Sequence, residues 1–218
     1  MSISRQSSKP SVPPRISPDP PMTKGPRART RKLMLETATR LMQSGLTPSV
    51  SDVAEAAEVS RATAYRYFPS QAALVQAVVD EALGPILRWE SSLDDAEARI
   101  TDLLDLSLPR INEFEATFRA ALKLSLEQGA RRQAGTFGDE VPFSRGHRVA
   151  LLASAISPLN DILAPDEFDG LVQGLSLVLG IEAFVVLKDI CNLDTSRTYE
   201  TAKKSAQAMI RQAVANSK

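Results

Sequence analysis

The sequence of 218 residues predicts an all-α protein. After the first 28 residues, almost every segment repeats its apolar residues with the 3.6-residue period of a helix, and no segment alternates apolar and polar residues as a half-buried strand does. Ser, Gly and Pro also stand where helices are expected to begin and end. We expect three regions: a tail over residues 1–28, a small helical domain over residues 29–75 and a larger helical domain over residues 76–218.

The tail is rich in proline and in basic side chains. Residues 1–28 contain seven prolines and almost no apolar side chains, so they cannot offset the entropy that ordering costs, and we expect them to be disordered. They lack the apolar segment of a signal peptide, which favours a cytoplasmic protein. Met22 lies inside the tail, and we hypothesise that translation starts there.

Residues 29–44 form the first predicted helix. A single stripe of apolar side chains repeats along it, and Gly45 follows as its C-terminal stop. The stripe consists of Met34, Ala38, Leu41 and Met42.

Two short helices follow, over residues 49–57 and 61–68. Ser49 and Asp52 have the spacing of a capping box, in which each side chain bonds the backbone N–H of the other residue. Ser60 can cap the second of the two helices. Two short helices with a tight turn between them form a helix-turn-helix.

A fourth helix, which Ser70 can cap, runs from the small domain into the larger one toward Pro85. The apolar run over residues 171–187 is interrupted by two polar side chains and is shorter than the roughly 20 residues of a membrane span, so we interpret it as a buried helix and expect no membrane partner. A loop is expected over residues 130–143. The remaining helices are expected at about 95–112, 113–129, 145–163, 166–190 and 195–215.

The net charge of zero conceals an asymmetry. Residues 1–68 carry a net charge of +6 and residues 69–218 a net charge of −6. A basic end on an acidic body suggests that only this end meets a polyanion. An ordinary solvated basic tail is the alternative.

The second helix of the helix-turn-helix carries side chains suited to reading DNA. Arg61 and Arg66 can each offer a bidentate fork to a guanine edge, and Ala62 can touch a thymine methyl group. The hydroxyl groups of Thr63, Tyr65 and Tyr67 suit phosphate contacts, which fix register without reading sequence. Alternatively, the two tyrosines are packing residues whose hydroxyl groups reach the surface. Ser49 and Ser60 lie at helix N-termini, which favour a phosphate.

The stretch "SVSDVAEAAEVSRATAYRYFPSQAAL" resembles the DNA-binding region of the tetracycline-repressor (TetR) family of bacterial transcription regulators. The match covers about residues 29–75 and includes the signature Thr63, Tyr65, Tyr67 and Phe68. The resemblance implies an all-α homodimeric repressor that a small-molecule effector releases from a palindromic operator. It also implies that the helices at about 166–190 and 195–215 form the dimer interface. The apolar run over residues 171–187 agrees, because it is apolar on more than one face.

Two residues depart from the family pattern. Glu58 replaces a Gly common in the turn, where a left-handed backbone would cost a non-glycine residue roughly 1 kcal/mol. Gln71 replaces a Lys that often meets a phosphate, and we hypothesise that basic residues before and within the start of the first helix compensate for the lost charge. The expected DNA contacts are Arg31, Ser49, Ser51, Ser60, Arg61, Ala62, Thr63, Tyr65, Arg66, Tyr67 and Gln71.

No catalytic or metal-binding constellation is visible. Cys191 and His147 are each the only residue of their kind, which leaves no disulfide framework, zinc cluster or Cys/His pair drawn from several copies, so we expect no cofactor and no enzyme activity. Cys191 is interpreted as a small buried residue, and His147 as a surface or capping residue, with ligand contact as the alternative. Candidates to line an effector pocket, each otherwise plain core, are Trp89, Phe114, Phe118, Phe137, Phe143 and Phe184.

Two other functions are compatible with these observations. An all-α ligand carrier or small enzyme could use the helix-turn-helix only as a scaffold, and a regulator could answer to a protein partner instead of a small molecule. The effector, the operator, the regulated genes and the choice between repressor and activator lie beyond the sequence.

Overall fold

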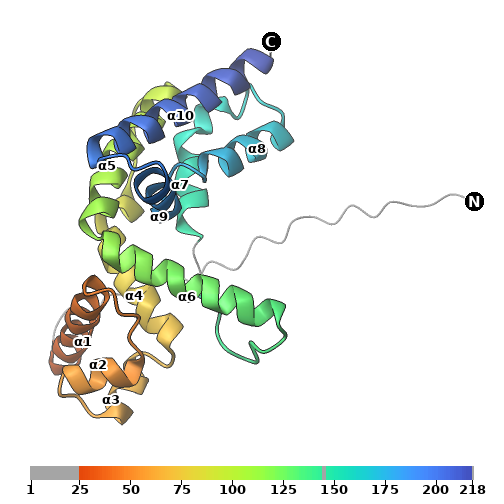
Figure 1. Ribbon diagram of the computed structural model, residues 1–218. Coiled ribbons are helices and arrows are strands. Elements are labelled where there is room, and N and C mark those ends of the chain that lie inside the picture. Colours follow the sequence, from red (N-terminus) through yellow and green to blue (C-terminus); the bar gives the residue numbers. More distant parts are fainter. Residues whose placement is uncertain (1–24, 144–145, 218) are drawn as a thin grey trace, which may run out of the picture.

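The computed structural model describes residues 25–143 and 146–217, and every regular element in these ranges is a helix (Figure 1). The all-α prediction is confirmed. The first four helices are α1 (Pro26–Gln43), α2 (Val50–Ala56), α3 (Arg61–Tyr67) and α4 (Gln71–Leu83). The 3-10 segment η1 (Gly84–Arg88) leads to α5 (Ala96–Glu113), α6 (Glu115–Gln133), α7 (His147–Ala155), the 3-10 segment η2 (Ser157–Leu159), α8 (Pro165–Leu175), α9 (Ile181–Phe184), the π-helical segment η3 (Val185–Ile190) and α10 (Thr195–Asn216).

The helices form two groups at opposite ends of the molecule. In Figure 1, α1 to α3 lie at the lower end, α5 and α7 to α10 at the upper end, and α6 crosses between them. Helix α4 packs against α1, α5 and α6, and α10 packs against α5 and α8. One continuous apolar core joins the two groups. In the described ranges, no helix is both long enough and apolar enough to cross a membrane.

The first three helices pack through small and apolar side chains. Met34, Ala38 and Met42 on α1 are fully buried, as the predicted stripe requires. In α3 itself only Ala64 is buried, and Phe68 is buried directly after it. Because α3 gives so little of its surface to the core, most of its side chains are left facing outward.

The chain enters α1 three residues earlier than the sequence predicts. The helix begins at Pro26, so residues 26–28 are helical although they belong to the segment predicted to be disordered. The first helical position suits proline, because its fixed φ matches the helix and its missing N–H would have no helical partner. Met22 and most of the predicted tail lie outside the described residues.

Two predicted helices of the larger domain are interrupted. The helix expected at about 145–163 ends at Ala155 and continues as η2, whose first turn contains Pro158. The helix expected at about 166–190 ends at Leu175 and restarts after Gly180, whose φ of 148° no helix can accommodate. Apolar periodicity continues through both breaks, so the pattern alone does not reveal them.

The surroundings of Cys191 also differ from the prediction. It follows η3 and is exposed instead of buried. The next residue, Asn192, has a left-handed backbone with φ of 53°, which turns the chain toward α10 and keeps this corner at the surface.

The turn between α2 and α3 has the left-handed backbone that the departure at Glu58 predicts, with φ of 53°. We expect Glu58→Gly to raise the free energy of unfolding by roughly 0.5–1 kcal/mol, because glycine removes the steric conflict of this conformation but loses more entropy on folding. Urea denaturation measures the change. The control is Glu55→Gly, an exposed helical position in α2, which should lower the stability by about 1 kcal/mol. Destabilisation by both variants would contradict the strain at Glu58.

Candidate nucleic-acid interface and interior cavity

The start of α2 is fixed by the predicted capping box. The Asp52 carboxylate accepts the Ser49 N–H at 2.8 Å, and the Ser49 hydroxyl oxygen accepts the Asp52 N–H at 3.1 Å. The hydrogen bond from the Ser49 backbone N–H is the largest influence that holds the pKa of Asp52 below its ordinary value, and the Ser49 side chain and the charge of Arg61 act in the same direction. Because the backbone N–H of Ser49 is engaged, a phosphate at this end would have to use the free N–H groups of the first turn.

Ser60 begins α3 as the sequence predicts. Its hydroxyl oxygen accepts the backbone N–H of Thr63 at 3.3 Å, and the same hydroxyl donates to the Thr63 side-chain oxygen at 2.9 Å. Thr63 is therefore half-buried and engaged locally, but its own hydroxyl hydrogen remains available for a phosphate oxygen.

The outward face of α3 consists of Arg61, Ala62, Tyr65 and Arg66, all exposed. Neither arginine forms a salt bridge with any residue that the structure describes. The Arg66 guanidinium lies 5.7 Å from the ring centre of Tyr67, which is half-buried against the core. Two guanidinium groups thus project from one short helix without a salt bridge to a described carboxylate, although the charge of Arg61 acts on the nearby Asp52 carboxylate.

The position of Tyr65 is compatible with both interpretations that the sequence leaves open: a phosphate contact, or a packing residue whose hydroxyl group reaches the surface. Its ring is 46% exposed, and its hydroxyl lies 3.3 Å from the hydroxyl of Ser51 on α2. The two hydroxyl groups tie the outer surfaces of α2 and α3 together. They also present a pair of oxygen atoms side by side on the exposed surface, where each can bind a phosphate.

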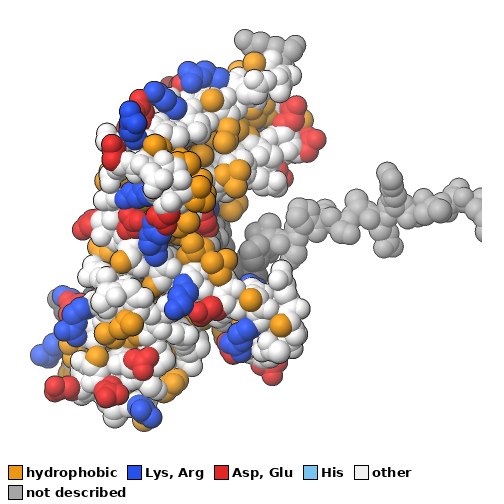
Figure 2. Space-filling view, viewed as in Figure 1, with side chains coloured by type: hydrophobic (Ala, Val, Ile, Leu, Met, Phe, Trp, Pro, Cys, Tyr) orange, Lys and Arg blue, Asp and Glu red, His pale blue; other side chains and the backbone are white. Residues whose placement is uncertain are grey.

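The N-terminal half of α1 extends the basic surface. Arg27, Arg29, Arg31 and Lys32 are all exposed on this helix, and Figure 2 shows Lys and Arg side chains along the edge that α1 forms. The Arg31 guanidinium lies 5.6 Å from the ring centre of Phe68, directly after α3. The basic residues hypothesised to compensate for Gln71 are therefore helical from Pro26 onward, and the charges of Arg27, Arg29, Arg31 and Lys32 are carried on a fixed element.

Gln71 joins two segments of the small domain. Its side-chain amide nitrogen donates to the backbone carbonyls of Thr47 at 3.0 Å and Pro48 at 3.1 Å. The loop before α2 is thereby fixed to the start of α4. A phosphate contact through this nitrogen would have to replace both bonds. The sequence pattern does not reveal this role, because the partners lie 23 and 24 residues away.

A cavity of about 90 Å³ lies between α4, α5, α6, α7 and the turn before α9. Apolar side chains line most of it, among them Val79 and Leu83 on α4, Ile111 on α5 and Phe118 on α6. Phe143, from the loop before α7, lines it as well. The polar side chains of its lining are Ser107, His147 and Arg148.

Four of the six aromatic residues named as pocket candidates lie outside the cavity. Trp89 is buried and donates its indole N–H to Asp102 at 2.8 Å. Phe114 lies under the Arg110 guanidinium at 4.4 Å, and Phe184 is fully buried with its ring centre 6.1 Å from that of Tyr199. The plain-core alternative describes these three, whereas the ring centre of Phe137, after α6, lies 5.5 Å from the Arg132 guanidinium. Phe118 and Phe143 line the cavity.

Two polar links close the cavity toward α4 and toward the turn before α9. His147 on α7 lies 3.0 Å from the Asp80 carboxylate on α4, and this hydrogen bond raises the pKa of His147 above its ordinary value of 6.5 despite the opposing effect of burial. Arg148 donates to the Ser176 carbonyl at 3.0 Å and to Glu182 at 2.8 Å. The φ of 148° at Gly180 favours glycine, and a Cβ atom there would also lie 2.7 Å from this guanidinium.

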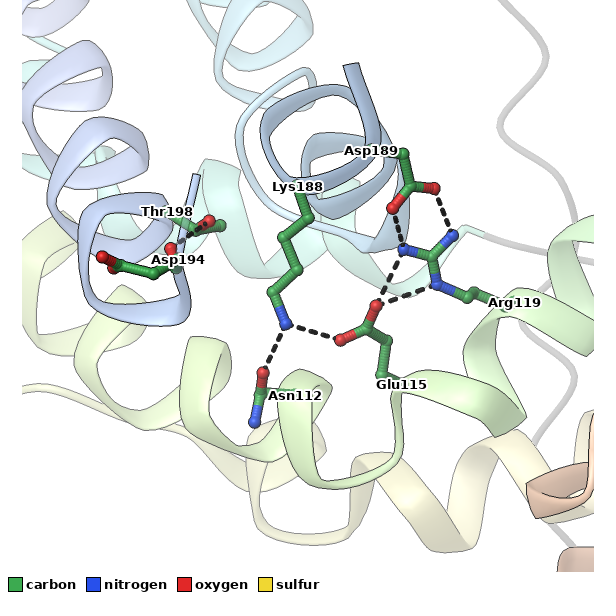
Figure 3. A network of polar contacts seen from close by, with 7 residues as sticks. All are labelled: Asn112, Glu115, Arg119, Lys188, Asp189, Asp194 and Thr198. Atoms are coloured by element: carbon green, nitrogen blue, oxygen red, sulfur yellow. Dashed lines mark hydrogen bonds and ion pairs between the residues drawn. The ribbon is translucent and has the colours of Figure 1, made fainter. Parts of the chain in front are cut away.

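A network of charged side chains clamps η3 against α5 and α6 (Figure 3). Lys188 donates to Asn112 and Glu115, each at 2.7 Å, and Arg119 forms ion pairs with Glu115 at 2.8 Å and with Asp189 at 2.6 Å. Burial alone would raise the pKa of Glu115, but the hydrogen bonds from Lys188 and Arg119 hold it below its ordinary value. These five side chains are thus linked to one another by hydrogen bonds and ion pairs. No cluster in the described residues has the composition of a metal site.

Comparison with known proteins identifies the small domain. Residues 34–78 match the sequence model of "Bacterial regulatory proteins, tetR family". The solved structure of a TetR transcriptional regulator from Rhodococcus sp. RHA1 is similar at a TM-score of 0.52, with 16% identity over 85% of this chain and 97% of that chain. A protein from Mesorhizobium loti assigned to the TetR family gives a TM-score of 0.48, with 19% identity over 88% and 98% of the two chains. No functionally curated protein matches the sequence.

The family match confirms the resemblance that the sequence motif suggests, and the Rhodococcus structure shows that the fold is shared. The family consists of regulatory proteins, so the expectation that the chain is not an enzyme is also confirmed.

The bond between His147 and Asp80 predicts a pH dependence of stability. Because the folded protein raises the pKa of His147, the contribution is fully present below the unfolded value of 6.5 and is lost as the pH rises through the folded value. We expect the stability advantage of the wild type over His147→Gln to shrink as the pH rises above about 6.5 and passes through the folded pKa of His147. Urea denaturation at several pH values measures it. Asp80→Asn should remove the same pH dependence, and a constant difference across this range would contradict the prediction.

Proposed function

We propose that this chain, a TetR-family DNA-binding transcription regulator, is a homodimeric repressor that a small-molecule effector releases from a near-palindromic operator. The observation that carries the proposal is the outward face of α3, which presents two arginines without a carboxylate partner among the described residues. A helix of this kind, backed by a second helix, is suited to enter the major groove. Repression, as opposed to activation, follows the resemblance to the family.

The contacts divide by their chemistry. Arg61 and Arg66 are the candidates for reading base edges, since a bidentate guanidinium contact to guanine distinguishes it from other bases. Ala62 lies between them on the exposed face and can meet a thymine methyl group. The hydroxyl pair of Ser51 and Tyr65 suits the phosphate backbone, and so does the Thr63 hydroxyl.

The basic edge of α1 supplies further backbone contacts. Arg31 is exposed and lies over the Phe68 ring, next to the end of α3. We propose that this edge, which also carries Arg27 and Arg29, supplies the positive charge for phosphate contacts that Gln71 lacks. The proposed DNA-binding domain covers residues 29–75, and the proposed effector and dimerisation domain covers residues 76–218.

Apolar side chains on the upper part of the molecule support a dimer. Figure 2 shows hydrophobic side chains gathered over α7, α8 and α9. Leu177 and Ile190 are 71% and 69% exposed, and Val186 is also exposed. Exposed apolar patches of this kind often mark contacts between proteins. We define these three residues as the turn-and-η3 patch and propose that it meets the partner subunit.

The two predicted dimer helices also pack against each other within one subunit. Ala202, Ala206 and Ile210 on α10 are buried against the core of the same chain. A Cβ atom added at Gly174 on α8 would lie 3.6 Å from the Met209 sulfur on α10, so glycine at this position permits close packing of the two helices within one subunit. In the proposed dimer, α10 therefore contributes its outer side and not this stripe.

The cavity is the proposed effector site, because α4 forms one of its walls. Val79 and Leu83 line it, and the same helix packs against α1. An effector that prefers one position of α4 favours the corresponding spacing of the two α3 helices in the dimer, and so shifts the population away from the DNA-binding state.

Arg66→Ala tests the reading role of α3. We expect binding to DNA from the region upstream of the coding sequence to weaken by about 1–3 kcal/mol, because one base-reading fork is lost. Mobility shifts at a fixed salt concentration measure the change. Lys204→Ala, an exposed cation on α10 at the opposite end of the molecule, should leave binding unchanged. Absence of any shift at low salt for the wild type would contradict DNA binding itself.

Leu177→Asp tests the turn-and-η3 patch. A charge at the centre of an apolar interface loses its hydration, so we expect the variant to be monomeric where the wild type has twice the chain mass of 23.6 kDa. Size-exclusion chromatography with light scattering measures the mass. Leu126→Asp is the matched control, since Leu126 on α6 is 65% exposed and lies outside the patch. A dimeric Leu177→Asp variant would exclude this patch from the interface.

A further inference from the structure

Ser107 is the unusual residue of the interior cavity. It lies in α5, is fully buried and lines the cavity among apolar neighbours. Its hydroxyl has no hydrogen-bond partner among the described residues. A buried hydroxyl without a partner is unfavourable, and such groups in folded proteins usually have a role. The cavity thus contains one unsatisfied polar atom.

The two cationic side chains of the lining are already engaged. Arg148 is bound to the Ser176 carbonyl and to both oxygen atoms of Glu182, at 3.1 Å and 2.8 Å. His147 is bound to Asp80 and lies 3.5 Å from the side-chain amide nitrogen of Gln76. A carboxylate ligand would have to displace Glu182 from Arg148 or Asp80 from His147, and so break hydrogen bonds that these side chains already form. The site therefore disfavours anions.

The cavity also limits the size of its ligand. Its volume is about 90 Å³. An apolar protein cavity of about 150 Å³ holds the six carbon atoms of one benzene molecule, so by proportion this space suits roughly four non-hydrogen atoms. Most of its wall is apolar, which favours a ligand whose body is hydrocarbon.

We propose that the effector is a small neutral molecule with a short hydrocarbon body and one hydroxyl or carbonyl oxygen, which forms a hydrogen bond with Ser107. The class comprises short-chain alcohols, aldehydes and ketones. This inference rests on the proposed effector function of the cavity and gives that effector its chemistry.

The position of the ligand connects it to the DNA-binding domain. A molecule bound to Ser107 on α5 contacts the opposite wall, which includes Val79 and Leu83 on α4. The first residue of α4, Gln71, holds the loop before α2. The ligand thus contacts α4 near its C-terminal end, whereas the loop before α2 is held at the N-terminal end of the same helix.

The binding test uses the full chain without DNA and two probes of equal carbon number, 1-butanol and butanoate. Three isoleucines line the cavity, and their methyl groups can be observed by NMR after selective labelling: Ile86, Ile111 and Ile181. We expect 1-butanol to shift these three signals saturably and to leave those of the exposed Ile162 and Ile190 unchanged. Butanoate should shift none of them at the same concentration.

Ser107→Ala tests the hydrogen bond, and we expect it to weaken 1-butanol binding about three- to tenfold. Thr117→Val is the matched control, because the Thr117 hydroxyl is equally buried and unpartnered among the described residues but does not line the cavity. Its affinity for 1-butanol should equal that of the wild type.

Three results would overturn the proposal: no shift of the cavity isoleucines with 1-butanol, butanoate binding as tight as that of the alcohol, or unchanged alcohol affinity in Ser107→Ala. The comparison of the two probes needs only the wild type, so it stands even if a variant fails to fold. Because no DNA is present, these results are independent of the mobility shifts that test the regulator function.

Discussion

Helix α4 is buried on both sides, and the arrangement of the whole molecule depends on this constraint. Leu74, Val75 and Val78 are fully buried between the first three helices and the larger helical body. A helix enclosed in this way cannot move on one side without repacking the other, because protein interiors are densely packed. The hydrogen bonds of Gln71 at its start and of Asp80 near its end add directional links to this apolar packing. The two halves of the protein are therefore mechanically coupled through one element.

The sequence predicts the local structure well where single residues decide it. Ser49, Ser60 and the left-handed Glu58 have the geometry that their positions imply, since capping and turn conformation depend on the next few residues. Longer helices are less predictable. Apolar periodicity runs through Gly180 without interruption, whereas the chain there turns sharply and leaves the helix.

The outward face of α3 can be predicted from the sequence because its burial pattern follows from one helix. The surroundings of Gln71 and of the cavity cannot, since they join side chains that lie far apart in the chain. His147 and Asp80, for example, are 67 residues apart, and neither residue type nor spacing points to the other. Phe118 lies at the cavity while Phe184 lies in solid core, although the two have the same chemistry. Only the packing of helices against one another distinguishes them.

The contact between Gly180 and Arg148 has a consequence for how the specificity of such a protein can change. The guanidinium occupies the space of a missing side chain and so fastens one wall of the cavity to α7. Any larger residue at position 180 would displace the Arg148 guanidinium and loosen that wall. The hydroxyl of Ser107, which is the proposed polar contact of the ligand, would be unchanged. The chemistry of recognition at Ser107 and the size of the space around it are thus set by different residues. Mutation can vary the one while preserving the other, and neither residue lies on the outward face of α3.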